Sequence, residues 1–253
     1  MQILVIVLYS KEKKKEQKPR SEDSDAGTAD LIRELGLAAP GTDFESDLQY
    51  ISIIGSIEGH IALPMENKTT KYEHLIPQLI AVEENPKLRG LLVILNTMGG
   101  DVEAGLALAE MIATLSKPTV SLVLGGGHSI GIPLATATDY SFIAGTATMT
   151  LHPIRTTGLV ITAETTFDYM RKTQDRVIDF IAGHSRATRK RVTELMNCSD
   201  NMSNDVGTIL FGKEAVEAGI IDAVGGVSQA LGELRRRVAK VDELEKEIST
   251  PAD

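Results

Sequence analysis

The sequence predicts an α/β fold built around a parallel sheet, and the alternation of two kinds of segment indicates it. Continuous apolar runs, of the kind buried on both faces of a sheet, occur at 90–96 (GLLVILN) and 118–127 (PTVSLVLGGG). Segments whose apolar residues recur at helical spacing lie between and around these runs. Strand, helix, strand and helix in short succession produce a parallel sheet with right-handed crossovers.

The individual elements follow from local signals. The β-branched stretch 48–57 (LQYISIIGSI) predicts the first strand, and Thr69 or Thr70 is expected to cap a helix that ends before Pro86. Further helices are predicted at 105–116, 129–137 (SIGIPLATA) and 162–185, and further strands at about 140–152. The charged segment 232–248 has few apolar positions, and we expect a solvated terminal helix there rather than a coiled coil.

Composition limits the classes of function. The chain has 253 residues, of which 42% are hydrophobic, and this is enough for one sizeable core. Its formal charge of 26 − 35 = −9 disfavours a nucleic-acid partner. Cys198 is the only cysteine, so no internal disulfide and no clustered thiolate metal site is expected, in keeping with a reducing compartment such as the cytoplasm. Neither a Walker pattern nor G-x-G-x-x-G is present, and we expect no cofactor.

Three parts of the chain differ in composition. Residues 1–48 are expected to be a largely disordered extension with a short helix at TADLIRELGL, residues 49–230 a single domain, and residues 231–253 a charged helix or tail. The first nine residues are apolar, but basic residues follow them instead of preceding them. The run is also shorter than the ~20 residues of a membrane span. We therefore expect an extension without a role or a weak membrane-surface contact.

Two glycine clusters follow neighbouring predicted strands, at 96–105 (NTMGGDVEAG) and 125–131 (GGGHSIG). Ligands of open α/β sheets bind beyond the carboxyl ends of the strands, where these clusters lie. Glycine permits a positive φ or a close approach of the backbone to a ligand. Residues 127–131 also fit G-x-S-x-G, the pattern of the lipase nucleophile turn. Tight structural turns are the alternative explanation, but two of them side by side, one carrying Ser129, favour an active site.

A serine nucleophile needs a general base, and the chain offers five histidines: His60, His74, His128, His152 and His184. His74 and His184 belong to predicted helices and are expected to be surface or capping residues. His60 lies in a loop, and the side chain of His128 is expected to point away from Ser129. His152 ends a predicted strand before Pro153, which makes it the best placed base.

The order of the candidates argues against a lipase. An α/β-hydrolase runs serine, acid, histidine, so His184 would be the base, with an acid between it and Ser129. The carboxylates of the long helix in that interval, Asp168, Asp175 and Asp179, are poorly placed for a loop at a strand end.

The order Ser129, His152 and a later acid resembles that of the Clp protease proteolytic subunits. Over about 90–225, LNTMGGDVEAG, GGGHSIG, MTLHP and GKEAVEAGIID resemble that family's glycine loop, nucleophile segment, histidine segment and the segment after its aspartate. Over 50–230, NKTTKYEHLIP, GGGHSIGIP, TATMTLHP and RTTGLVI resemble its translocation-enhancing subgroup most. The resemblance implies the ClpP/crotonase-like fold, with repeated β-β-α units and a helical handle.

The resemblance also implies roles for particular residues. Ser129 is the implied nucleophile, His152 the general base, and the backbone N–H groups of Gly100 and Ile130 the oxyanion hole. Counting back from GKEAVEAG places the family's aspartate at Gly207. The nearest carboxylate is Asp205, which implies a two-residue insertion, and Asp200 is the alternative.

Departures from the family pattern leave the function open between classes. The glutamine after the histidine is missing, Thr97-Met98 replaces Ser-Pro, and His128 replaces a small residue. The main hypothesis is a cytoplasmic serine peptidase that acts on peptides or unfolded proteins, forms a homo-oligomeric ring through the handle at 158–185 and has a possible Clp-type ATPase partner. The second is a non-proteolytic factor that assists protein export. A crotonase-type protein acting on acyl-CoA thioesters is a third, against which the Ser-His-Asp set argues.

Overall fold

The computed structural model describes residues 46–155, 162–199 and 206–249. The apolar run at the N-terminus, the helix expected at TADLIRELGL, and both Asp200 and Asp205 lie outside these residues. The strands are β1 (Leu48–Glu58), β2 (Thr69–Lys71), β3 (Gly90–Gly100), β4 (Thr119–Gly127), β5 (Tyr140–Ile143), β6 (Thr148–Leu151), β7 (Thr208–Phe211) and β8 (Ala223–Val224). The helices are α2 (Tyr72–Glu84), α3 (Val102–Ala113), α4 (Gly131–Thr136), α5 (Ala163–Gly183), α6 (Arg189–Met196), α7 (Gly212–Glu217) and α8 (Val227–Ser249).

The sheet is parallel along its main path, as the sequence predicts. Its strand order is β2-β1-β3-β4-β5-β8, and every neighbouring pair on this path is parallel. Strand β6 leaves the path by pairing with the end of β4, and it forms an antiparallel pair with β7. The structure therefore confirms the mixed α/β fold with a mostly parallel sheet.

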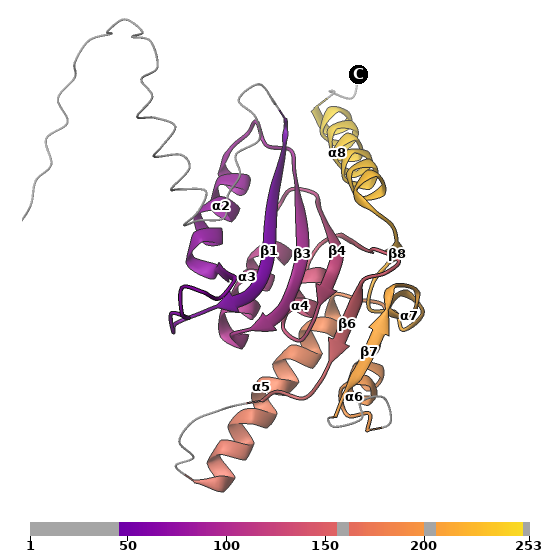
Figure 1. Ribbon diagram of the computed structural model, residues 1–253. Coiled ribbons are helices and arrows are strands. Elements are labelled where there is room, and N and C mark those ends of the chain that lie inside the picture. The colour runs from indigo at the N-terminus through magenta and orange to yellow at the C-terminus, as the bar shows by residue number, and fades with distance from the viewer. Residues whose placement is uncertain (1–45, 156–161, 200–205, 250–253) are drawn as a thin grey trace, which may run out of the picture. The chain divides into compact units, whose positions relative to one another are not determined.

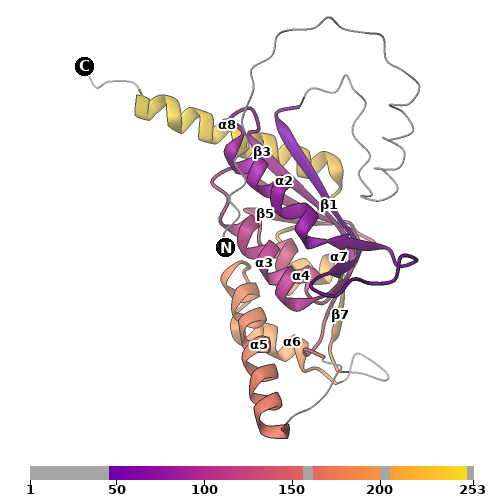
Figure 2. The same cartoon turned by 90° about the vertical axis from the view of Figure 1, so that its left-hand side faces the viewer.

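Both faces of the central strands are covered, which explains their continuous apolar sequences. In β3, Leu91, Val93 and Leu95 join the core formed with α2, α3 and α4. Leu92, on the opposite face, packs in a second cluster with residues of α8. Alternate side chains of one strand thus enter different cores, because successive residues of a strand point to opposite faces. Figures 1 and 2 show α2, α3 and α4 on one side of the sheet and α8 on the other.

Helix α8 is packed along part of its length, which differs from the solvated helix expected at 232–248. Ala230, Leu234 and Val238 are buried against the sheet at helical spacing. Farther along, Leu244 and Ile248 are exposed, and this end of the helix extends beyond the sheet in Figure 2. The expectation was wrong for the first half of the helix because a few apolar residues at the right spacing suffice to dock it.

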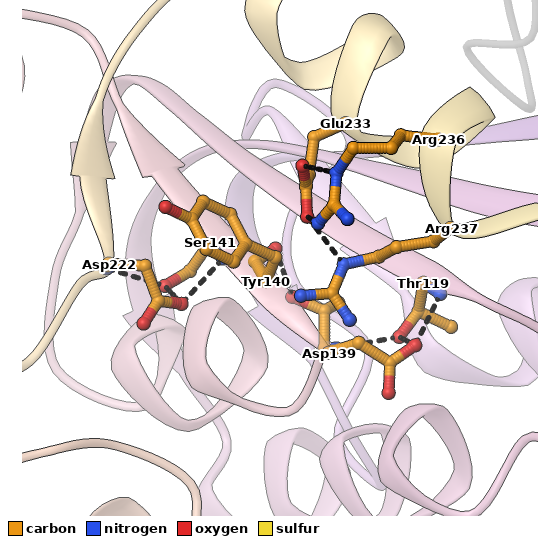
Figure 3. A network of polar contacts seen from close by, with 9 residues as sticks. Thr119, Asp139, Tyr140, Ser141, Asp222, Glu233, Arg236 and Arg237 are labelled. Carbon is orange, nitrogen blue, oxygen red and sulfur yellow. Dashed lines mark hydrogen bonds and ion pairs between the residues drawn. The ribbon is translucent and has the colours of Figure 1, made fainter. Parts of the chain in front are cut away.

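A polar network holds α8 to the edge of the sheet (Figure 3). The guanidinium of Arg237 lies 5.3 Å from the ring centroid of Tyr140, and it donates to Glu233 on its own helix. In the same network, the backbone N–H and the hydroxyl of Ser141 both donate to Asp222, at 2.9 and 2.8 Å. These contacts join β5 to the segment before β8.

The expected start of the first helix is wrong. Thr69 and Thr70 form strand β2 with Lys71, and α2 begins at Tyr72 without a side-chain cap. The hydroxyl of Thr70 is used elsewhere, since it accepts from the N–H of Ile54 and donates to the same residue's carbonyl. Pairing with β1 therefore satisfies the groups that capping would have used. The expected end before Pro86 is confirmed, because α2 ends at Glu84.

Candidate active site

Ser129 lies in a strained turn between β4 and α4. Its φ is 54°, a left-handed conformation that costs a non-glycine residue roughly 1–2 kcal/mol. Backbone hydrogen bonds hold the turn from both sides. The N–H of His128 donates to the Thr97 carbonyl at 3.1 Å, and the N–H of Ser129 donates to the Thr150 carbonyl at 2.9 Å. A strained serine between a strand and a helix is the local geometry of a nucleophile turn.

The Gly99-Gly100 loop packs directly against this serine. Gly99 has a φ of 93°, and a Cβ there would lie 2.7 Å from the Cβ of Ser129. A Cβ at Gly100 would lie 2.2 Å from the carbonyl oxygen of Ile57. Any side chain at either position would displace its neighbour, so the close approach of the two loops requires glycine. The structure thus brings together the two glycine clusters that the sequence predicted to be adjacent.

Thr97 fixes the shape of the glycine loop, a role that was not predicted from the sequence. Its buried hydroxyl donates to the carbonyl of Gly55 at 2.6 Å and accepts from the N–H of Gly99 at 3.0 Å. The Thr97 carbonyl meanwhile accepts from His128. One residue therefore connects β1, the glycine loop and the turn that carries Ser129.

Ile130 is the buried residue that follows Ser129, and it precedes α4 as its N-cap. Within the described residues, no hydrogen bond from its N–H is found. An N–H at the start of a helix is a suitable donor for a developing negative charge.

His152 follows β6, the strand whose Thr150 accepts from Ser129. Its Nδ1 lies 2.7 Å from the carbonyl oxygen of the next residue, Pro153. No hydrogen bond between the hydroxyl of Ser129 and the His152 ring is found in the described part of the chain. Catalytic contacts of this kind are often long in a free enzyme and shorten when substrate binds.

Gly207 lies beside His152, at the place where the family pattern puts the aspartate. In the antiparallel β6–β7 pair, Leu151 is opposite Thr208, and the register has no shift. A Cβ at Gly207 would lie 3.0 Å from the Cβ of His152 and 2.3 Å from the carbonyl oxygen of Leu151. Counting back from GKEAVEAG thus leads to the residue beside His152 across the β6–β7 pair, and that residue is glycine.

His128 contributes a second imidazole next to Ser129. Its Nδ1 lies 2.9 Å from the hydroxyl of Thr150, two residues before His152. Burial lowers the pKa of His128 below its usual value, and the nearby His152 lowers it further. Both effects favour the neutral form of the His128 imidazole. The strand predicted at about 140–152 offered a signal for Thr150, because residues two apart in a strand point to the same side.

A shallow pocket of about 390 Å³ borders the turn that carries Ser129. It is lined by Gly55, Asn96, Thr97, Met98, Gly125, Gly126 and His128. The Asn96 side chain accepts from the N–H of Gly126 at 2.9 Å, which holds β3 and β4 together at this edge.

The remaining histidines are placed much as expected. His184 caps the end of α5, with Nδ1 at 2.8 Å from the Phe180 carbonyl and its ring stacked on that of Phe180. His60 lies edge-on to Tyr72 in an exposed loop, and His74 is half-buried on α2.

The described residues contain no group of three or more His, Cys, Asp or Glu side chains arranged to bind a metal ion. In the same residues, no helix combines the length and the apolarity that crossing a bilayer requires.

Comparisons with known proteins agree with this geometry. The chain is 53% identical, over 88% of its length and 87% of the relative's, to the translocation-enhancing protein TepA of Halalkalibacterium halodurans. It is 25% identical, over 59% of its length and 76% of the relative's, to an ATP-dependent Clp protease proteolytic subunit of Streptococcus uberis. The fold is similar to that of a point mutant of ClpP1 from Listeria monocytogenes, with a TM-score of 0.58, 18% identity and coverage of 72% of this chain and 94% of that one. The Clp protease family model matches residues 46–228, and the chain belongs to that family.

Proposed function

We propose that the chain is a serine peptidase of the Clp type, with Ser129 as nucleophile and His152 as general base. The observation that carries this proposal is the strained turn of Ser129, which is pressed against Gly99 and bonded to the strand that leads to His152. Strain of this kind persists only where the surrounding structure imposes it, and it is common at active sites.

The chemistry follows from the positions of these groups. Nε2 of His152 takes the proton of the Ser129 hydroxyl as Oγ attacks the peptide carbonyl carbon. The resulting oxyanion accepts from the N–H groups of Gly100 and Ile130. His152 then gives its proton to the leaving amine, and an acyl-enzyme forms on Ser129. Water activated by His152 hydrolyses this ester and regenerates the serine.

For the acid we propose Asp205, which precedes Gly207 by two residues, rather than Asp200. Gly207 lies against His152, and Asp205 is therefore only two residues along the chain from a neighbour of the proposed base. The role of the acid is to stabilise the imidazolium that forms in the transition state.

The substrate and the assembly follow from the family. We propose a peptide or unfolded protein as substrate, a homo-oligomeric ring, a Clp-type ATPase partner and a cytoplasmic location. Helix α5 extends away from the sheet (Figure 1), and Phe167 and Tyr169, in the first half of this helix, are exposed, which supports its use as a handle between subunits.

A non-proteolytic role in protein export is the second candidate. The name of the relative that is 53% identical supports it, as does the glycine at the position of the family's aspartate. In this case the fold would be kept for binding, and the serine would be dispensable.

The two candidates are tested with one pair of variants. We expect Ser129→Ala to abolish hydrolysis of a fluorogenic peptide by the purified full-length chain. Ser228→Ala, at an exposed position of α8, is the control and should leave hydrolysis unchanged. Secretion of a reporter protein is measured in cells that carry each variant. Full secretion with Ser129→Ala, together with no hydrolysis by the unsubstituted chain, would overturn the peptidase proposal in favour of the export factor.

A further inference from the structure

The hydrogen-bond partner of the His152 ring is a main-chain carbonyl. Nδ1 of His152 lies 2.7 Å from the carbonyl oxygen of Pro153. A carbonyl oxygen only accepts hydrogen bonds, so Nδ1 must carry the proton. A neutral imidazole has one N–H, and Nε2 therefore keeps the lone pair that a general base needs.

This is the tautomer that the carboxylate of a catalytic triad enforces. In such triads the acid accepts from Nδ1 and so leaves Nε2 free to take the serine proton. The Pro153 carbonyl has the same acceptor function, although it brings no negative charge.

Gly207 lies beside His152 across the β6–β7 pair and has no side chain that could accept from Nδ1 in place of the Pro153 carbonyl. A Cβ at Gly207 would contact Leu151 and His152 at 2.3 and 3.0 Å. A carboxylate that started from this position would have to displace the backbone around the ring.

The peptide group that carries this carbonyl is anchored at its other end. The N–H of Ile154 belongs to the same planar unit as the Pro153 carbonyl. It donates to Oε1 of Gln174 on α5, at 3.2 Å. Pro153 has a fixed φ and restricts His152 to extended conformations. Helix α5 thus holds the peptide plane, and the plane aims its carbonyl at His152.

We propose that the Pro153–Ile154 peptide, held by Gln174, orients His152 in place of a carboxylate. Gln174 is then a positioning residue, and Asp205 contributes charge at most, not the acceptor for Nδ1. This inference rests on the proposed peptidase function, since it assigns the orienting group of the same base.

The kinetic test measures the rate at which a fluorophosphonate labels Ser129, as a function of pH. If a carboxylate set the tautomer of His152, replacing that aspartate by asparagine would lower the labelling rate by about 10⁴-fold. We expect Asp205→Asn and Asp200→Asn each to cost less than about tenfold, because neither supplies the acceptor for Nδ1. A loss of about 10³-fold or more in Asp205→Asn alone would overturn the inference.

The anchor is tested with two substitutions of similar size. Gln174→Met removes the acceptor for the Ile154 N–H, and we expect labelling to slow by ~10- to 100-fold through misplacement of the base. Gln174→Glu keeps an acceptor oxygen. On a logarithmic scale, its labelling rate should lie at least halfway from that of the Met variant to that of the unsubstituted chain. A Met variant that labels as fast as the unsubstituted chain contradicts the anchoring role. Equal thermal midpoints in the two variants exclude a general loss of folding.

A spectroscopic readout separates this inference from the peptidase proposal. Nitrogen NMR of ¹⁵N-histidine-labelled full-length chain, with the His152 signals assigned through a His152→Gln variant, reports which ring nitrogen carries the proton. We expect protonated Nδ1 and bare Nε2 in the unsubstituted chain and in Asp205→Asn. The opposite tautomer, or a change of tautomer in Asp205→Asn, overturns the inference even if Ser129 labels normally. Failure of Ser129 to label, with the expected tautomer, would instead overturn the peptidase proposal alone.

Discussion

The turn that carries Ser129 and the strand end that carries His152 are held in different ways. Backbone hydrogen bonds and two glycines without room for a side chain fix the serine turn. The histidine is oriented by the carbonyl of the next residue, beside a glycine where the family pattern has an acid. The serine side of the site is therefore visible in the sequence through its glycines. The histidine side depends on a main-chain carbonyl, which a residue of any type supplies.

The largest effect is expected from a methyl group added between the Gly99-Gly100 loop and the turn that carries Ser129. In Gly99→Ala, the new Cβ lies 2.7 Å from that of Ser129, at a φ of 93°. We expect fluorophosphonate labelling to fall by at least ~100-fold and the free energy of unfolding to fall by roughly 1–3 kcal/mol. Gly183→Ala is the matched control, because a Cβ there meets nothing within 4 Å. If Gly99→Ala labelled normally, the tight fit of the serine side would be disproved.

A smaller effect is expected where the two sides meet. Thr150→Val removes the hydrogen bond to Nδ1 of His128 but keeps the backbone bond from Ser129 to the Thr150 carbonyl. We expect a loss of about 1 kcal/mol in the free energy of unfolding in urea. Labelling should change by less than about threefold, since the serine turn stays bonded to β6. A loss of labelling as large as that of Gly99→Ala would show that the threonine hydroxyl, and not the backbone, connects the two sides.

The smallest effect concerns the dependence of stability on pH. The pKa of folded His128 is lowered, whereas in the unfolded chain it returns to about 6.5. Below that pH the unfolded chain binds a proton more readily than the folded one, so stability falls as pH falls until the folded imidazole is protonated too. Above it, both states are neutral at this residue and the effect disappears.

The measurement is the thermal midpoint at about pH 8 and about pH 5, on either side of the unfolded pKa, in the unsubstituted chain and in His128→Asn. We expect the variant to lose less stability between the two values. An equal loss in both proteins would show that His128 does not cause the decrease.

Much of the fold and part of the site could be predicted from the sequence. Burial of β3 and β4 could be predicted because it requires apolar residues along both strands. The close approach of the backbone at 99 and 100 could be predicted because it requires glycine. Thr69 and Thr70 were misread because strand pairing with β1 took precedence over local capping. Thr97 and Thr150 were missed because their hydroxyl contacts join segments far apart in the chain. The acceptor for His152 was missed because a backbone carbonyl leaves no trace in the sequence.

The central claim is that Ser129 is an activated nucleophile, and covalent labelling tests it most directly because it needs neither a substrate nor a partner protein. The full-length chain is treated with a fluorophosphonate, and the modified peptide is identified by mass spectrometry. We expect one adduct per chain on Ser129, lost in Ser129→Ala and in His152→Ala and kept in Ser228→Ala. An unmodified Ser129, or labelling that is equally fast in Ser129→Ala, would contradict the claim.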